Sequence, residues 1–167
     1  DMYLNTARYS LIKDVKDMLN IPVIANGDID SPEKAKYVLD YTGADAIMIG
    51  RAAQGRPWIF REIAHYLKTG QYLDAPSITE VKDVLLGHLA ELYEFYGEYS
   101  GCRISRKHIA WYTKGLRSSN EFRQGMYQVE NTADQYRVVE DYFNTLLEHG
   151  STMSDVQVEQ VNLLETK

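Results

Sequence analysis

The sequence contains a single cysteine, Cys102, among its 167 residues. One thiol cannot form an internal disulfide framework, and such scarcity favours a reducing, cytoplasmic setting. No apolar run approaches the roughly 18 residues that a membrane helix needs, and the polar segment that follows Asp1 predicts no signal peptide. The cysteine, histidine and carboxylate residues show no zinc-type spacing, so we expect neither a metal site nor a membrane partner.

The sequence also has fewer basic residues than acidic ones. Lys and Arg total 18 against 24 Asp and Glu, a net charge of −6, which argues against a wholly basic nucleic-acid-binding protein. However, no acidic residue occurs between Glu98 and Glu121. This basic window contains five cations: Arg103, Arg106, Lys107, Lys114 and Arg117. A local patch of this kind suits binding to phosphate, although most charge runs are solvated helix faces.

The side chains of the basic window divide by helical angle. At about 100° per residue, the first four cations fall within an arc of about 100°, whereas Ile104, Trp111 and Tyr112 lie on another side. We therefore expect a helix that packs with one face and exposes cations on the other. We interpret His108 as a packed, hydrogen-bonded side chain and Cys102 as a small buried or semi-exposed one.

The first 70 residues alternate between helical and strand patterns. The predicted elements are a helix at 8–19, a strand at 21–25, a helix at 31–41, a strand at 46–49 and a helix at 57–68. Ser31 with Pro32 is a typical helix start, and Gly43 is a typical helix end. The strands are short apolar runs typical of buried strands, and the alternation predicts a parallel sheet. A doubly wound sheet and a barrel would both contain such a sheet, and the chain is shorter than the roughly 250 residues of a complete eightfold barrel.

The character of the sequence changes near residue 70. Residues 70–77 have the composition of a linker, and only helical patterns follow. Ser77 with Glu80 has the spacing of a capping box. Apolar residues that continue to Tyr99 then mark one face of a long helix.

Three shorter helices follow in the sequence. One is predicted at 104–114, and the other two begin at capping pairs, Ser118 with Glu121 and Thr132 with Gln135. Together with the long helix they make a small bundle over residues 73–150. The polar tail, 151–167, is expected to be weakly ordered.

Two glycine-containing loops follow the two predicted strands. Asn26, Gly27 and Asp28 end the first strand, and Gly50 and Arg51 end the second, 24 residues after Asn26. Glycine lets the backbone approach a phosphate, the N-terminus of a helix favours an anion, and arginine supplies charge-assisted hydrogen bonds. We therefore predict a phosphate site at these five residues, with plain turns as the alternative interpretation.

The same segments carry a family resemblance. Residues 21–29 (IPVIANGDI) and 50–60 (GRAAQGRPWIF) resemble the tRNA-dihydrouridine synthase family, in particular its bacterial B-type branch. Residues 103–112 (RISRKHIAWY) and 122–124 (FRQ) are similar to that family's helical domain. The resemblance covers about residues 2–150.

The resemblance implies an α/β part followed by an all-α part. Residues 1–72 would be the C-terminal β/α units of a (β/α)8 TIM barrel that binds FMN, and residues 73–150 would be a helical domain that binds tRNA. It further implies that NADPH reduces the flavin, which then reduces the C5=C6 bond of a uridine. The predicted phosphate-site residues would hold FMN, and the cations of the basic window would contact tRNA.

The family's catalytic cysteine belongs to a motif that nothing in this sequence matches, because no proline follows Cys102 and this cysteine lies in the helical part. The resemblance therefore places the catalytic cysteine upstream and implies an inactive fragment. Two alternatives stay open: a non-catalytic RNA-binding module of similar descent, and another FMN or sugar-phosphate barrel enzyme in which the basic window has no role.

Overall fold

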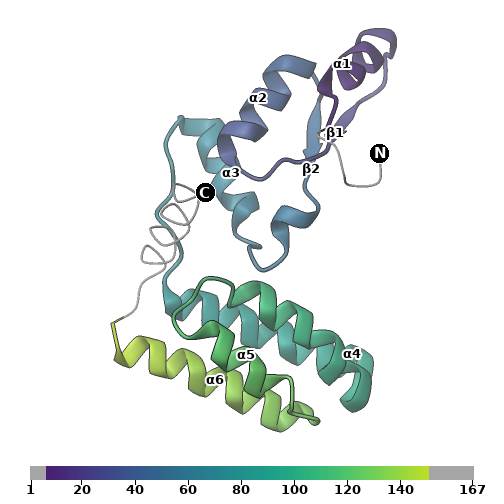
Figure 1. Cartoon of the computed structure of the whole chain (residues 1–167). Helices are drawn as coiled ribbons and strands as arrows, with labels where there is room; N and C mark the ends of the chain where they lie inside the picture. Colours follow the sequence, from purple (N-terminus) through teal and green to yellow (C-terminus); the bar gives the residue numbers. More distant parts are fainter. Residues whose placement is uncertain (1–6, 151–167) are drawn as a thin grey trace, which may run out of the picture. The chain divides into compact units, whose positions relative to one another are not determined.

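The computed structural model describes residues 7–150 and divides into two compact units, with the division between Asp74 and Ala75 (Figure 1). The sequence predicted this boundary two residues earlier, at 72/73. The predicted tail, 151–167, lies outside the described residues.

The first unit alternates helices and strands as predicted. Its elements are α1 (Tyr9–Met18), β1 (Ile24–Asn26), α2 (Pro32–Thr42), β2 (Ala46–Met48), the 3-10 turn η1 (Arg51–Ala53) and α3 (Ile59–Thr69). The strands pair in parallel, with Ala25 opposite Ile47. The predicted parallel sheet is confirmed over these two strands, and its membership of a TIM barrel stays a prediction.

Local sequence signals set the limits of α2. The Ser31 hydroxyl oxygen accepts a hydrogen bond from the Lys34 N–H at 3.1 Å, and Pro32 occupies the first helical position. Gly43 ends the helix in the left-handed region, with φ 67°, and its N–H bonds to the Leu39 carbonyl. Glycine adopts this conformation without the steric cost that a side chain brings. Both predicted ends of this helix are therefore confirmed.

The sheet has one covered face and one exposed face. Ala25 is fully buried against the helices, in a cluster that contains Val38 and Ile59. Side chains alternate along a strand, and Ile24 and Met48, which point away from that cluster, are each 57% exposed. The prediction of buried strands is therefore wrong for one face. Leu11, Val15 and Met18 of α1 are exposed as well.

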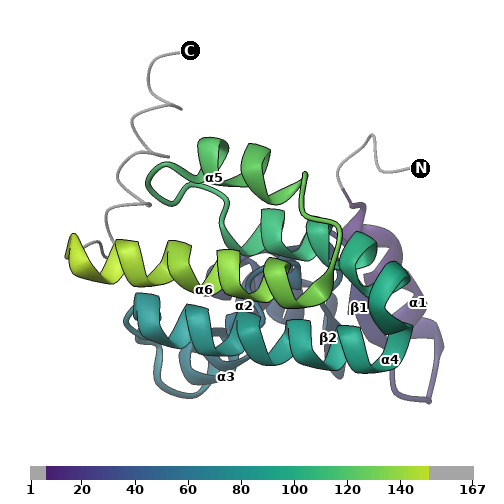
Figure 2. The same cartoon turned by 90° about the horizontal axis from the view of Figure 1, so that it is seen from below.

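The second unit is a helical bundle of α4 (Ile78–Tyr112), α5 (Ser119–Met126) and α6 (Thr132–Glu148), in which α6 packs along α4 (Figure 2). The predicted cap at the start of α4 is confirmed, because the Ser77 hydroxyl oxygen accepts a hydrogen bond from the Glu80 N–H. The bundle itself matches the prediction from the helical patterns.

The helix α4 is a hairpin of two arms. Gly97 has φ 73° and ψ 177°, outside helical geometry, and it separates the two arms. The arms run back along each other, so that the rings of His88 and His108 lie 4.7 Å apart. The predicted long helix to Tyr99 is therefore wrong beyond Gly97. The aromatic residues near the turn are exposed rather than packed: Phe95, Tyr96 and Tyr99.

Two predicted helix caps are also wrong. Ser118 has φ 53° and makes no capping hydrogen bond with its side chain. The helix α6 is capped by Asn131, whose side-chain oxygen accepts from the Asp134 N–H at 2.8 Å. Thr132 instead donates its N–H and its hydroxyl to the Glu98 carboxylate. That tertiary contact supplies the acceptors that a local cap would have supplied.

Gly97 and Gly87 form a matched pair for testing the hairpin. Gly97→Ala should destabilise the chain by about 1 kcal/mol or more, because a side chain at positive φ is strained. Gly87→Ala lies inside an arm of α4, where an added Cβ meets nothing within 4 Å. It should stabilise the chain by up to about 1 kcal/mol through helix propensity. Urea unfolding followed by circular dichroism measures both, and equal effects of the two substitutions would contradict the assigned turn.

Candidate functional site

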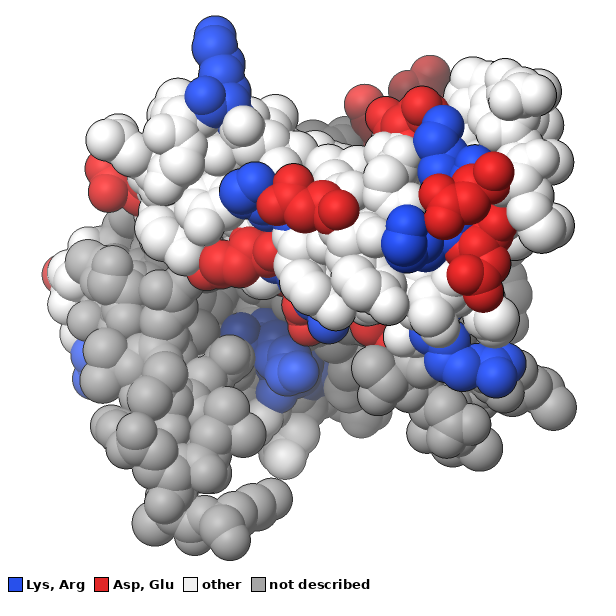
Figure 3. All heavy atoms as spheres, turned by 90° about the horizontal axis from the view of Figure 1, so that it is seen from above, with Lys and Arg blue, Asp and Glu red and all other residues white. Residues whose placement is uncertain are grey.

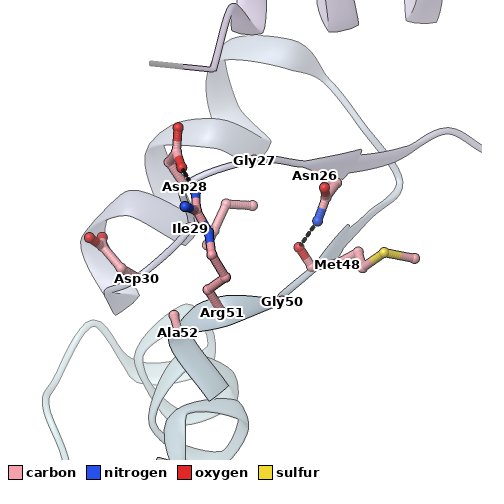
Figure 4. A pocket seen from close by; sticks show the side chains of 9 residues that line it. All are labelled: Asn26, Gly27, Asp28, Ile29, Asp30, Met48, Gly50, Arg51 and Ala52. Carbon is pink, nitrogen blue, oxygen red and sulfur yellow. Dashed lines mark hydrogen bonds and ion pairs between the residues drawn. The ribbon is translucent and has the colours of Figure 1, made fainter. Parts of the chain in front are cut away.

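The two loops that follow β1 and β2 line one open pocket of about 350 Å³ (Figure 4). All five residues predicted from the sequence to form a phosphate site lie in its wall: Asn26, Gly27, Asp28, Gly50 and Arg51. Parallel strands present their carboxyl ends at the same edge of a sheet, so the pairing of β1 with β2 brings the loops together. The structure therefore brings the predicted set into one place, and their ligand stays a prediction.

Side chains of the loops tie the two strand ends together. The Asn26 side-chain amide donates to the Met48 carbonyl oxygen at 2.8 Å. The Arg51 guanidinium contacts the Asp28 carboxylate at 2.7 Å, with the arginine side chain 60% exposed. The Asn26 side chain thus links the ends of β1 and β2, whereas the Arg51 side chain remains accessible from the pocket.

Gly27 is required by close packing. Its φ is 131°, and an added Cβ would lie 2.6 Å from the Cβ of Ala7. Its carbonyl oxygen accepts a hydrogen bond from the Tyr9 hydroxyl at 2.6 Å. Burial and the nearby Asp28 raise the pKa of Tyr9, so this hydroxyl keeps its proton and stays a donor. Because a trans peptide directs its N–H opposite to its C=O, this contact fixes the direction of the Asp28 N–H.

The charge of the pocket is mixed. Asp28 and Asp30 both line it, and the second carboxylate oxygen of Asp28 accepts from the Ala7 N–H at 3.0 Å. The face drawn in Figure 3 likewise carries basic and acidic side chains next to one another. Because carboxylates line the pocket beside Arg51, binding of an anion there depends on local donors rather than on a general positive field.

The local donors suit a phosphate monoester. A guanidinium carries five N–H donors, and the Arg51 side chain is exposed enough for an anion to reach it. The turn η1 begins at Arg51, beside the pocket. An added Cβ on Gly50 would meet nothing within 4 Å, so packing does not fill the space above this glycine. The residues present fit the phosphate end of a cofactor.

Sequence reasoning missed two residues beside this pocket. The Arg56 guanidinium donates to the Asp30 carbonyl oxygen at 3.2 Å and contacts the Glu62 carboxylate at 2.6 Å. Arg56 stands in the quoted segment 50–60, but only the fold shows that Glu62 and the loop after β1 lie next to it.

The cations of the basic window do not share the one exposed helix face that the sequence predicted. Arg103 and Lys107 are exposed on the second arm of α4. Arg106 is half-buried and donates to the Val129 carbonyl oxygen at 2.9 Å, so it does not share the exposed face. Lys114 and Arg117 are exposed but follow the end of α4 at Tyr112. The predicted single face of four cations on one helix is therefore wrong, and its tRNA contacts stay a prediction.

The packing face of this arm also differs from the prediction. Ile104 and Trp111 are only partly buried. The buried residues of the arm are Gly101, Cys102, Ser105, Ile109 and Tyr112. The angular pattern separated polar from apolar side chains, but the bundle buries the face that meets α6, where small and polar residues fit.

A buried glutamine joins three helical segments of the bundle. Gln135, predicted as part of a cap, is fully buried in α6. Its side-chain oxygen accepts from the hydroxyls of Tyr93 and Ser105, and its amide donates to the Cys102 carbonyl at 3.1 Å. Because unpaired buried amides are costly, these bonds specify the register of α6 against both arms of α4.

Cys102 is buried, as the sequence allowed, and 1% exposed. Its thiol lies 3.6 Å from the Val129 carbonyl oxygen. Burial raises the pKa of the Cys102 thiol above its ordinary value, so it stays protonated and unreactive near neutral pH. It therefore has a packing role.

Among residues 7–150, no helix is both long and apolar enough to cross a membrane. Within that same range, no three His, Cys, Asp or Glu side chains are grouped so that they could hold a metal ion.

Comparison with known proteins identifies close relatives. The family model for dihydrouridine synthase (Dus) matches residues 1–148. The chain is 55% identical over 148 residues to tRNA-dihydrouridine synthase B of Shewanella oneidensis, covering 89% of this chain and 46% of the relative. The protein of the same name from Vibrio vulnificus is 56% identical over 145 residues, with 87% and 45% covered. The chain thus spans less than half the length of these curated relatives. The B-type branch predicted from the sequence is confirmed.

His108 makes the stability of the chain sensitive to acid. Burial, with contributions from His88 and Lys107, lowers the pKa of His108 to about 4 from 6.5. An unfolded chain therefore binds more protons than the native one between these values, so stability should fall as pH drops from 6.5 towards 4. Urea midpoints measured across this range should show that loss, and His108→Gln should reduce it. His149→Gln, at an exposed site, is the control, and an unaltered pH slope in the His108 variant would contradict the assignment.

Proposed function

Because the chain belongs to the dihydrouridine synthase family, we propose that it forms part of a flavin-dependent enzyme that reduces a uridine of tRNA. The observation that carries this proposal is the pocket at the ends of β1 and β2, where the exposed Arg51 side chain would contact a phosphate. The family likeness supports FMN as the ligand, with the first unit as two β/α units of a TIM barrel. A tRNA substrate implies a cytoplasmic enzyme.

The roles of this chain's residues follow from their positions. Bound FMN, reduced by NADPH, would supply the hydride that saturates the C5=C6 bond of uridine. Arg51 would contact the phosphate, and Gly27 and Gly50 would let the backbone approach it. Asn26 would keep the two loops at a fixed separation through its bond to the Met48 carbonyl.

We assign no proton donor for the reduction to the described residues. Cys102 is buried in the helical unit, where a substrate in solvent cannot reach its thiol. Burial also raises the pKa of this thiol, so it holds its proton more tightly. The acid would lie in the part of the longer relatives that this chain does not span, so the chain alone is proposed to be inactive.

Replacing Arg51 tests the phosphate site. In the complete synthase that contains this segment, Arg51→Ala should weaken FMN binding by about tenfold to a hundredfold. The reason is the loss of a charge-assisted contact worth roughly 1.5–3 kcal/mol. Titration followed by flavin fluorescence measures the affinity. Lys36→Ala removes another exposed, ion-paired cation of the same unit and should leave FMN affinity unchanged. Wild-type affinity in the Arg51 variant would remove this residue from the site.

Exposed cations of α4 test the RNA interface. Arg103→Gln with Lys107→Gln should weaken tRNA binding, because phosphate contacts contribute most of the affinity. The plot of log affinity against log salt should become shallower by about one unit per lost contact. Arg137→Gln, which removes an exposed cation from α6, is the control. If affinity and slope match the wild type in the double variant, the basic window is a solvated surface and the proposed tRNA contact there fails.

A further inference from the structure

We infer that Arg56, oriented by Glu62, is a positioning residue for the loop that holds the FMN phosphate. This inference rests on the proposed function of the same pocket. The phosphate loop is here residues 26–30, which follow β1 and line the pocket. Arg56 is absent from the pocket wall, so it acts through the loop and makes no contact with the cofactor itself.

Arg56 joins three parts of the first unit. It follows η1 and precedes α3, its Nη1 donates to the Asp30 carbonyl oxygen at 3.2 Å, and its Nη2 contacts the Glu62 carboxylate at 2.6 Å. The Glu62 side chain is 12% exposed and the Arg56 side chain 39% exposed. Loss of either partner from a partly desolvated ion pair is costly, because it leaves a charge without compensation. The carboxylate therefore holds the guanidinium in the orientation that reaches the loop.

Near each end of the phosphate loop, a backbone carbonyl accepts a hydrogen bond from a side chain that lies outside the loop. Tyr9 donates to the Gly27 carbonyl oxygen, and Arg56 donates to the Asp30 carbonyl oxygen. In a trans peptide the N–H that follows points opposite to the carbonyl. The Tyr9 contact therefore fixes the direction of the Asp28 N–H, and the Arg56 contact fixes the backbone at Asp30, where the loop ends. A loop that binds an anion through N–H groups binds it more tightly when their directions are set beforehand.

Arginine suits this role better than lysine. Its planar fork donates to two acceptors at fixed angles, here a carboxylate and a backbone carbonyl. A lysine would keep one positive charge near Glu62 but cannot reproduce the paired geometry. Arg56→Lys therefore keeps a positive charge beside the partly buried Glu62 carboxylate but removes the contact that orients the loop.

The experiment compares FMN with riboflavin, which is the same flavin without the phosphate. In the complete synthase, Arg56→Lys should weaken FMN binding by about threefold to tenfold, as expected for the loss of one hydrogen bond. Riboflavin affinity should stay at its wild-type value, because riboflavin has no group that reaches the loop. Glu62→Gln should produce the same selective loss. Arg61→Lys, the same substitution at an exposed position of α3, is the matched control.

The outcomes distinguish this inference from the proposed function. Parallel losses of FMN and riboflavin affinity would show a merely structural role for Arg56 and overturn the inference. Unchanged FMN affinity in both the Arg56 and Glu62 variants would overturn it as well. If the wild-type protein bound the two flavins equally, the phosphate site itself, and the inference that rests on it, would fail. Selective loss of FMN in both variants, with a normal control, supports the positioning role.

Discussion

The parallel pairing of β1 with β2 places the carboxyl ends of two strands at one edge of a sheet, and the candidate chemistry of the first unit depends on this arrangement. The Asn26 amide closes the joint by donating to the Met48 carbonyl. A shift of one residue in the register would turn Ala25 away from the helices and separate Asp28 from Arg51. The short paired segment therefore determines both the core of this unit and the geometry of its pocket.

The second unit depends on a different constraint, the satisfaction of a buried amide. Gln135 can lie in the core only because Tyr93, Ser105 and the Cys102 carbonyl complete its hydrogen bonds. The turn at Gly97 brings two of the partners, from different arms of α4, to the same point. Polar specification of this kind favours one arrangement of the helices over others with similar apolar contact.

Features that depend on neighbouring residues or on a general rule of sheet topology could be predicted from the sequence, and individual contacts between distant residues could not. The Ser31 and Ser77 caps require only local partners, and the five pocket residues follow from the rule that parallel strands end at one edge. In contrast, glycine is tolerated inside helices, so no local signal distinguished Gly97 from Gly87. The partner of Arg106 is Val129, 23 residues away, and helical angles reveal only the direction of a side chain.

If a second copy of the chain covered the exposed face of the sheet, with Ile24 and Met48, the folding equilibrium would depend on protein concentration. Whatever covers that face, whether a second copy or other polypeptide, binds the native state and not the unfolded one. Mass action then raises the apparent melting temperature as the covering species becomes more abundant. Melting temperatures of the first unit would then be comparable only between samples at equal concentration. Effects of substitutions there will also differ between this chain alone and a longer protein in which the face is occupied.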